Sequence, residues 1–483
     1  MKTNEAVKRQ LLSQAEEAIE VLLAQIEEIQ TGDFQHLEHK ILENVMELGR
    51  RSMETILASA AREEPVPVPK EGRCGHALKR AGEREKTVIT LMGPIVITRA
   101  YYHCKEKKQG EEAPAPKCPG TIPFDEQWGL TRRQASPGVQ RVIAKWAARL
   151  TFEEVADSVA DVLPLSLSAR QVGLLIQPMG EAYAQQESDQ ASQYLRQGSE
   201  KRLSEAQRQE EQGELIRRLY VEMDGVMARL RRGSVVMEVQ EEERAGDVYR
   251  EIKVGAAFVG LPGRERSELV PGVLVDACGP KQYVARQASA EEFAPLVYAL
   301  ARQSGVLRAE QVVILGDGAR WIWKLADEQF PGAIQIVDEY HAREHVWNVA
   351  RATFAAESER RDTWASGVIE ALGEGRIEAV IAAIEKLPAL SPEPGKAKSI
   401  QQTEAEYFRH NAHRMRYPVF RAQGMHLGSG IAEAACKTVV STRAKKSGMR
   451  WTPHGLAAVL ALRSALLSQT FDLAWLRYSQ RAS

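Results

Sequence analysis

The chain has 483 residues, of which 44% are hydrophobic and 27% charged, as in an ordinary globular protein of about two to four domains. Its five cysteines are few and scattered, which does not favour a disulfide framework and fits a reducing compartment. No apolar run approaches the roughly 20 residues of a membrane helix, and the charged N-terminus lacks a signal-peptide core. We therefore expect a cytoplasmic protein with no membrane partner.

The net charge of −1 conceals an asymmetry along the chain. Residues 409–483 carry twelve lysines and arginines against only Glu433 and Asp472, a balance of +10 that leaves −11 on the remainder. A basic C-terminal region attracts phosphate, although a solvated helical surface would have the same composition.

Residues 1–62 are predicted to be an N-terminal helical region. Apolar residues recur three and four positions apart from Leu12 to Ile29, and again from Leu37 to Leu48 after a break at Gly32-Asp33. A helical hairpin or short coiled coil would bury this stripe, either within one subunit or between subunits in an oligomer.

A β-hairpin is predicted over 87–104, around Met92-Gly93-Pro94, within a ribbon-like module over 70–130. Four residues near it are candidate zinc ligands: Cys74, His76, Cys104 and Cys118. No CxxC pair is present, so a degenerate ribbon or ordinary buried cysteines are favoured over bound zinc.

Residues 131–185 have the pattern of three short helices with a helix-turn-helix spacing. Arg170 and Gln171 lie near the start of the third helix, from which a recognition helix would reach base edges. Such trios also occur for structural reasons alone. Residues 186–214 are nearly devoid of apolar side chains and are predicted to be a linker or an exposed helix.

Residues 215–354 are predicted to form the first part of a catalytic core. Strands are expected over 217–225, 233–240, 250–260 and 272–279, followed by a helix over 290–303 and two strand-helix pairs over 311–354. Meandering strands followed by alternating strands and helices are the order of a ribonuclease H-like α/β domain. The expected fold class is therefore multidomain α+β, with N-terminal modules preceding this domain.

Two aspartates are each predicted to end an apolar strand just before a glycine. These are Asp224 and Asp317, about 93 residues apart. An Asp-Gly pair is a common turn signal, but sites in α/β sheets gather at strand ends. A third acid, Glu433, lies near the start of a helix among Ala432, Ala434 and Ala435. A glutamate there would also complement the helix dipole.

Carboxylates on separate rigid elements suit a two-metal site. Two Mg²⁺ or Mn²⁺ ions roughly 3.5–4 Å apart activate a nucleophile and stabilise a leaving oxygen in phosphoryl transfer. Such hard cations prefer oxygen ligands over cysteine or histidine.

Three stretches carry a family resemblance: YVEMDGVMA (220–228), the run 312–347 and the run 428–468. They strongly resemble DDE transposases of ISKra-type bacterial insertion sequences, which are distantly similar to the Mutator superfamily. The resemblance implies a ribonuclease H-like fold with a helical insertion over 355–425, followed by a catalytic glutamate helix and a basic part over 426–483. This chain differs from the family's pattern because its N-terminal ribbon lacks paired cysteines.

By this resemblance, Asp224, Asp317 and Glu433 are the catalytic metal ligands, and Asp338 and His341 match the family's D-x-x-H signature. His341 is expected to contact a phosphate or to orient Asp317 or a metal-bound water, while Asp338 alternatively caps a helix. Five basic residues are expected to bind DNA phosphates: Lys437, Arg443, Lys445, Lys446 and Arg450.

The expected function is a DNA transposase that binds terminal inverted repeats and target DNA as a homodimer or higher homo-oligomer, in the nucleoid. Two alternatives stay open: a domesticated transposase that acts as a DNA-binding regulator, and a nuclease of the same fold that does not join strands. An ordinary metabolic enzyme is not favoured, because no phosphate-binding glycine motif follows a strand.

Overall fold

In a computed structural model, the chain forms two compact units: residues 1–179 together with 471–483, and residues 180–470. The structure describes residues 5–27, 33–62, 71, 77–104, 120–130, 134–196, 214–231, 248–266, 274–354, 358–392, 394–446 and 448–482. The two units differ from the seven predicted segments chiefly at the C-terminus, where α19 (Phe471–Ala482) belongs to the first unit. Among the described helices, none is long and apolar enough to cross a membrane.

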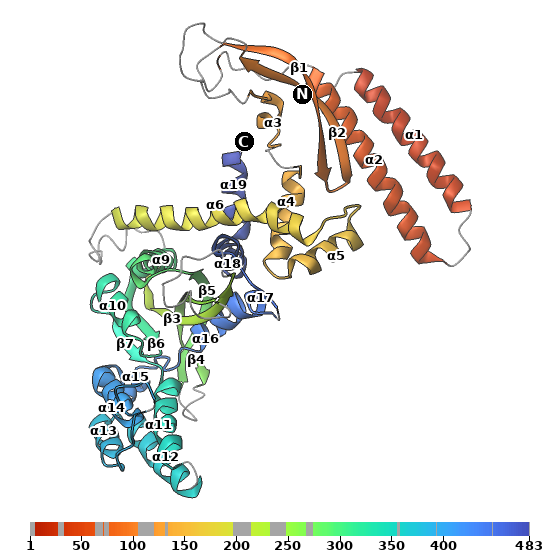
Figure 1. Ribbon diagram of the computed structural model, residues 1–483. Coiled ribbons are helices and arrows are strands. Elements are labelled where there is room, and N and C mark those ends of the chain that lie inside the picture. The colour runs from red at the N-terminus through yellow and green to blue at the C-terminus, as the bar shows by residue number, and fades with distance from the viewer. Residues whose placement is uncertain are drawn as a thin grey trace. The chain divides into compact units, whose positions relative to one another are not determined.

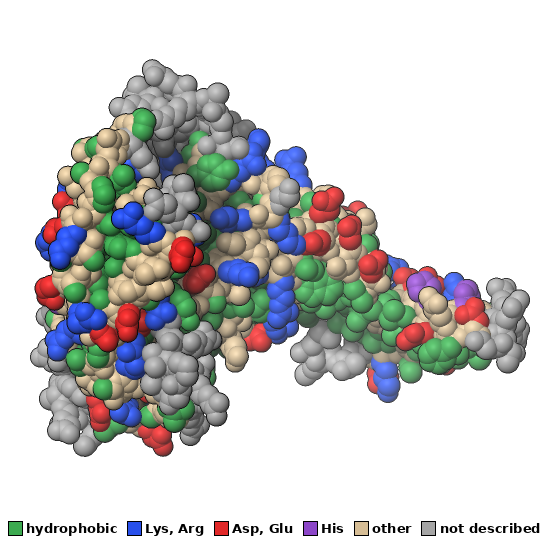
Figure 2. Space-filling view, turned by 90° about the horizontal axis from the view of Figure 1, so that it is seen from below, with side chains coloured by type: hydrophobic (Ala, Val, Ile, Leu, Met, Phe, Trp, Pro, Cys, Tyr) green, Lys and Arg blue, Asp and Glu red, His purple; other side chains and the backbone are tan. Residues whose placement is uncertain are grey.

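The N-terminal helices form the predicted hairpin. Helix α1 (Glu5–Glu27) packs against α2 (Phe34–Arg62), and Glu17 of α1 forms an ion pair with Arg51 of α2 at 2.7 Å. Much of the apolar stripe stays in solvent, with Leu12 55% and Ile19 57% exposed. Figure 2 shows hydrophobic side chains gathered along these helices. The hairpin of one chain therefore covers only part of its own apolar surface.

The β-hairpin consists of β1 (Leu78–Thr90) and β2 (Gly93–Cys104), paired antiparallel from Thr90 opposite Gly93 to Leu78 opposite Cys104. It is longer than predicted because residues 79–85 are exposed and mostly charged, so no apolar alternation marks them. The short helix α3 (Pro123–Gln127) follows, and its Asp125 forms an ion pair at 2.8 Å with the buried Arg99 of β2.

Three further helices confirm the predicted trio: α4 (Pro137–Ala147), α5 (Phe152–Val162) and α6 (Ala169–Arg196). A Thr151–Glu154 capping box begins α5, as such a pair does in many helices. Helix α6 continues to Arg196, so residues 186–196 are helical as one alternative expected, but they are only partly exposed, since Ala191 is 1% exposed and lies in the core of the second unit. Residues 197–213 lie outside the described residues. Asp472 of α19 pairs with Arg141 of α4 at 2.7 Å, which attaches the C-terminal helix to this unit.

The second unit contains a mixed five-stranded sheet in the order β5-β4-β3-β6-β7. Its strands are β3 (Ile216–Leu230), β4 (Val248–Arg266), β5 (Leu274–Arg286), β6 (Ala309–Gly316) and β7 (Ile334–Val337). Strands β3, β4 and β5 pair antiparallel, whereas β6 pairs parallel with both β3 and β7. The predicted order of elements is confirmed at this level, and the predicted strand 233–240 lies outside the described residues.

Helices lie between the later strands of this sheet and after the last one. They are α9 (Ala290–Gln303), the single turn η2 (Val306–Arg308), α10 (Arg320–Gln329) and α11 (Glu339–Thr353). Helix α9 packs on β4 and β5, where its Phe293 lies close to Gly255. Because Gly255 pairs with Met223, α9 covers the sheet face that carries Leu219, Val221 and Met223, all fully buried.

The predicted insertion is helical throughout its described residues. It comprises α12 (Ser358–Gly373), α13 (Ile377–Glu385), α14 (Ile400–Asn411), η3 (Ala412–Arg414) and α15 (Tyr417–Ala422). These helices gather beside α11 at the lower end of Figure 1. Phe408 and Tyr417 are fully buried and join the same core as the sheet, so the insertion is packed into the second unit.

The C-terminal block of this unit runs as α16 (Gly430–Ala435), η4 (Cys436–Ser441), α17 (Thr442–Ala444) and α18 (Pro453–Leu467). Segment η4 is a π-helix, a form that is frequent at functional sites. Helix α16 packs on β3 and β4, and η4 packs on β3 and β5. The block therefore covers the sheet face opposite α9.

Candidate functional site

The parallel pairing of β3 with β6 brings two of the predicted acids to neighbouring positions. The last paired residues are Glu222 and Leu315, and Asp224 and Asp317 each follow two positions later. Because side chains alternate along a strand, both aspartates lie on the face that carries Glu222. This is the face covered by α16 and η4.

Asp224 differs from the expectation in one respect: it does not end its strand. Strand β3 continues to Leu230 because β4 supplies partners along its whole length, with Asp224 opposite Val254. Only the pairing with β6 stops. Asp317 follows β6 as predicted and begins a turn, in which its Oδ1 accepts the amide of Ala319 at 2.9 Å and Gly318 has a φ of 103°. The aspartates therefore lie where two adjacent strands diverge.

Glu433 is linked to this pair of aspartates by Cys436, which lies one helical turn after it. It is exposed on α16, and the buried Cys436 lies three residues later at the start of η4. The thiol of Cys436 donates to Asp224, and burial together with the charges of Asp224, Glu433 and Asp317 raises the pKa of Cys436. All three predicted acids thus act electrostatically on one buried thiol.

The surroundings of Asp224 shift its pKa. Burial raises its pKa above the ordinary value, and the charge of Asp317 adds to this. Three groups oppose the shift: the amide of Gly225, which donates to Oδ1 at 2.6 Å, the thiol of Cys436 and the charge of His341. A half-buried carboxylate beside a second one is stabilised by any nearby positive charge.

His341 and Asp338 have different roles around the acids. Asp338 caps α11, as the alternative proposed, because its Oδ1 accepts the amides of Tyr340 at 2.6 Å and His341 at 3.1 Å. Its Oδ2 accepts the hydroxyl of Ser429 at 2.6 Å, which ties the start of α11 to the turn before α16. The His341 ring is half-buried, and its Nδ1 lies 3.6 Å from Oε2 of Glu344. The charge of His341 lowers the pKa of Asp224.

The remaining polar residues on this face of β3 hold the segment that leads to Glu433. Tyr220 donates to Asp276 at 2.7 Å and accepts the amide of His426 at 3.3 Å. Two residues along, Glu222 accepts the amide of Ala432 at 2.8 Å. With Asp224 bound to Cys436, successive even-numbered residues of β3 contact successive points of 426–436. This ladder sets where α16, and hence Glu433, lies on the sheet.

Glu222 was not among the predicted site residues, although a signal for it exists. It is 1% exposed, and burial raises its pKa to about 8. A glutamate inside an apolar strand, on the face of a predicted catalytic aspartate, is the pattern that marks it. Buried carboxyl groups require hydrogen-bond partners, so its presence there predicts a nearby donor.

The three predicted acids offer the type of ligand atom that a hard divalent cation prefers. Carboxylate oxygens from Asp224, Asp317 and Glu433 are ligands that Mg²⁺ and Mn²⁺ prefer. Burial raises the pKa of Asp224, and the charge of Asp317 adds to it; a cation would offset that charge. Within the part of the chain that the structure describes, no group of three or more acidic, histidine or cysteine side chains is close enough to hold an ion. The three acids lie near the same thiol but not close enough together to coordinate one ion.

The predicted DNA-binding residues divide by exposure. Lys437, Lys445 and Arg450 are exposed and Lys446 is half-buried. Arg443 corrects the expectation: it is 0% exposed and lies 5.1 Å from the centre of the Trp451 ring, so it is a packing residue here. Arg443 follows shortly after the π-helix η4, in which the spacing of side chains differs from that of a regular helix.

In the first unit, Arg170 is exposed at the start of α6. Gln171 instead accepts the amide of Ser168 at 2.8 Å and its hydroxyl at 2.9 Å, so its side chain caps the helix. This contact occupies the side-chain oxygen of Gln171.

Several basic residues of 409–483 are also used internally. Arg409 pairs with Glu385 at 2.5 Å, Arg421 with the buried Glu339 at 3.1 Å, and Arg463 donates to the carbonyl of Thr438. The balance of +10 therefore overstates the charge that this region offers to phosphate.

Of the candidate zinc ligands, Cys104 ends β2 and is half-buried. Cys74, His76 and Cys118 lie outside the described residues.

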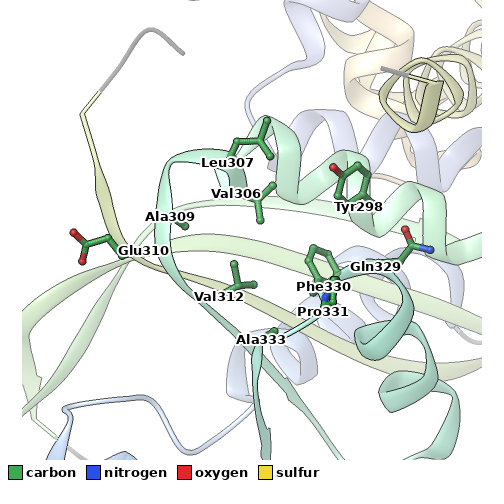
Figure 3. A pocket seen from close by; sticks show the side chains of 10 residues that line it. All are labelled: Tyr298, Val306, Leu307, Ala309, Glu310, Val312, Gln329, Phe330, Pro331 and Ala333. Atoms are coloured by element: carbon green, nitrogen blue, oxygen red, sulfur yellow. The ribbon is translucent and has the colours of Figure 1, made fainter. Parts of the chain in front are cut away.

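A small hollow lies at the opposite end of β6 from Asp317 (Figure 3). It is lined by Tyr298, Val306, Leu307, Ala309, Glu310, Val312, Gln329, Phe330, Pro331 and Ala333. Its lining is largely apolar, and it is separated from the acids by the length of the strand. It is therefore distinct from the acidic site.

Neither a comparison with protein-family models nor a search of curated proteins finds a match for this chain.

Proposed function

We propose that this protein is a DNA transposase in which Asp224, Asp317 and Glu433 carry out metal-dependent phosphoryl transfer. The observation that carries the proposal is the β3–β6 register, whose last pair, Glu222 and Leu315, lies two residues before Asp224 on β3 and two residues before Asp317, just beyond the end of β6. The interaction of Asp224, Asp317 and Glu433 with the single thiol of Cys436 supports the third member.

The strand order supports a ribonuclease H-like assignment. Three antiparallel strands followed by two parallel ones, with helices between them, are the arrangement that the family resemblance implies. The helical insertion between α11 and α16 falls where the resemblance expects it. Fold alone does not define function, so the proposal depends on the acids.

Two Mg²⁺ or Mn²⁺ ions held by these acids would supply charge neutralisation for the attacking and leaving oxygens. The surrounding residues of the chain hold the acids in position. Asp224 is held by the amide of Gly225 and the thiol of Cys436, and Asp317 by the turn at Gly318. His341, whose charge reaches Asp224, is suited to contact a DNA phosphate.

The proposed partners are the terminal inverted repeats of an insertion sequence and a target DNA. The exposed Lys437, Lys445 and Arg450 beside the acids would contact phosphates, and Arg170 on α6 would contact the repeats. Self-association through the uncovered face of α1 and α2 would bring two active sites to the paired ends. The proposal also includes a site of action in the nucleoid.

The decisive experiment is a cleavage and strand-transfer assay on the element's own ends with Mg²⁺ or Mn²⁺, comparing wild type with Asp317→Asn. We expect wild type to cut and join, and the variant to bind the ends while losing both activities by at least about 100-fold. Glu310→Asn, an exposed acid at the other end of β6, is the matched control and should keep full activity.

Two alternatives give different results in the same assay. A regulator derived from a transposase would bind the ends and cut with neither metal. A nuclease of this fold would cut without joining. Full activity of Asp317→Asn would show that the ligand assignment is wrong.

A further inference from the structure

The helical insertion reaches the turn that carries Asp317. Tyr407 of α14 donates its hydroxyl to the main-chain carbonyl of Asp317 at 2.9 Å. Pairing of β6 with β7 ends at Gly316. The Tyr407 hydroxyl therefore takes the place of a strand partner at the first residue beyond the sheet.

The Tyr407 ring also packs over the next residue of the turn. A Cβ at Gly318 would lie 2.5 Å from Cε2 of Tyr407, and Gly318 has a φ of 103°, which side chains rarely adopt. The close approach thus requires glycine at 318. Ring and hydroxyl together fix both ends of the Asp317-Gly318 peptide.

Tyr407 is itself held by α11. The ring of His345 stacks on it at 3.7 Å between centroids, with an interplanar angle of 23°. Nδ1 of His345 lies 2.5 Å from Oε2 of Glu404, which is 9% exposed and one helical turn before Tyr407. A carboxylate, an imidazole and a phenol thus form a continuous contact from the insertion to the turn.

We propose that Tyr407 is a positioning residue, through which the helical insertion fixes the main chain of Asp317 and so the direction of its carboxylate. Ordinary docking of a helix on a sheet needs only apolar contact, which Phe408 and Tyr417 already supply. Tyr407 instead uses a directed hydrogen bond on the turn of a predicted catalytic acid. The metal part of this inference rests on the proposed function; the positioning of the turn does not.

The test compares Tyr407→Phe with wild type by hydrogen exchange of the amides of 316–320 and by Mn²⁺ titration followed calorimetrically. Tyr298→Phe is the control, because Tyr298 is a buried tyrosine of the same unit at the far end of β6. We expect Tyr407→Phe to speed exchange in this segment by about three- to tenfold and to weaken Mn²⁺ binding similarly, with a thermal unfolding midpoint equal to that of the control.

Exchange at 316–320 that matches wild type in Tyr407→Phe would overturn the inference, as would faster exchange spread equally over the unit. Faster exchange confined to the turn, in a protein that neither binds Mn²⁺ nor cleaves DNA, would support the positioning and contradict the proposed function. Gly318→Ala gives a second reading: it should disturb the same segment through the clash with the Tyr407 ring.

Discussion

Glu222 and Asp224 are two positions apart on one face of β3, yet they meet different surroundings. Glu222 is fully enclosed and bound to the amide of Ala432, whereas Asp224 is half-buried at the divergence from β6. Glu222 therefore serves the packing of the fold, whereas Asp224 is partly accessible to solvent. The same alternation that places Asp224 on this face of β3 also places the buried Glu222 behind it.

The stability of the second unit should depend on pH through Glu222, whose pKa burial raises to about 8 from 4.5. Since the folded state then holds the proton more tightly than the unfolded state, the free energy of unfolding falls as pH rises from about 4.5 to 8. Glu222→Gln keeps an acceptor for Ala432 and removes the titration. Relative to wild type, it should gain on the order of 1–3 kcal/mol between about pH 5 and pH 8.

Urea unfolding without divalent metal at the two pH values measures this gain, with the exposed Glu310→Gln as the matched control. A constant difference between Glu222→Gln and wild type across the pH range would be incompatible with a buried, titrating Glu222.

At the scale of elements, α6 crosses α18 closely in the second unit, at Gly180. A Cβ at Gly180 would lie 2.5 Å from Cα of Ala458, so the two backbones touch where α6 carries a glycine. Helix α18 packs in turn on β5. Backbone atoms of a packed helix move little, so this crossing has no room for a methyl group.

Two glycine-to-alanine changes in helices should consequently have opposite effects. Alanine is favoured over glycine in a helix by about 1 kcal/mol, but at Gly180 we expect the clash with α18 to exceed this and to lower stability by about 1–3 kcal/mol. Gly367 of α12 is exposed and has no atom within 4 Å of a built Cβ. There the same change should raise stability by about 0.5–1 kcal/mol.

Thermal and urea unfolding of the two variants measure these effects. Equal signs would show that the α6–α18 crossing is looser than described.

At the scale of the whole molecule, the two units leave different surfaces open. The second unit has a large shared core that includes the helical insertion. The first unit carries α1, in which Leu12, Ile19 and Ile26 are all exposed and seven positions apart. Exposed apolar residues at heptad spacing are typical of a coiled-coil seam, and under the proposed self-association this seam would pack against the same seam of a second copy.

Self-association should therefore be lost in the double variant Ile19→Glu, Ile26→Glu. Each isoleucine that is buried between copies contributes about 1.5–3 kcal/mol, so the dissociation constant should rise by about 100-fold or more. Sedimentation velocity over a concentration series reports it. Ser13→Glu adds a charge to the same helix beside the seam and should have little effect. A wild-type chain that stays monomeric throughout would rule out this surface as the contact.

Patterns local in the chain predicted much of this protein. Apolar periodicity predicted α1, α2 and the trio α4 to α6, and β-branched runs predicted the strands of the sheet and the helices that follow them. The turn at Asp317 followed from one Asp-Gly pair. These features depend on neighbours within a few residues, which the sequence displays directly.

Other features depended on residues that the chain brings together only when folded. Arg443 is buried and packs on the Trp451 ring, Glu222 binds an amide about 210 residues away, and Tyr407 binds a turn 90 residues earlier. The sequence by itself determined the elements and nominated Asp224, Asp317 and Glu433. Only the tertiary structure decided that β3 and β6 run side by side, because strand pairing is a contact between distant residues that no local pattern records.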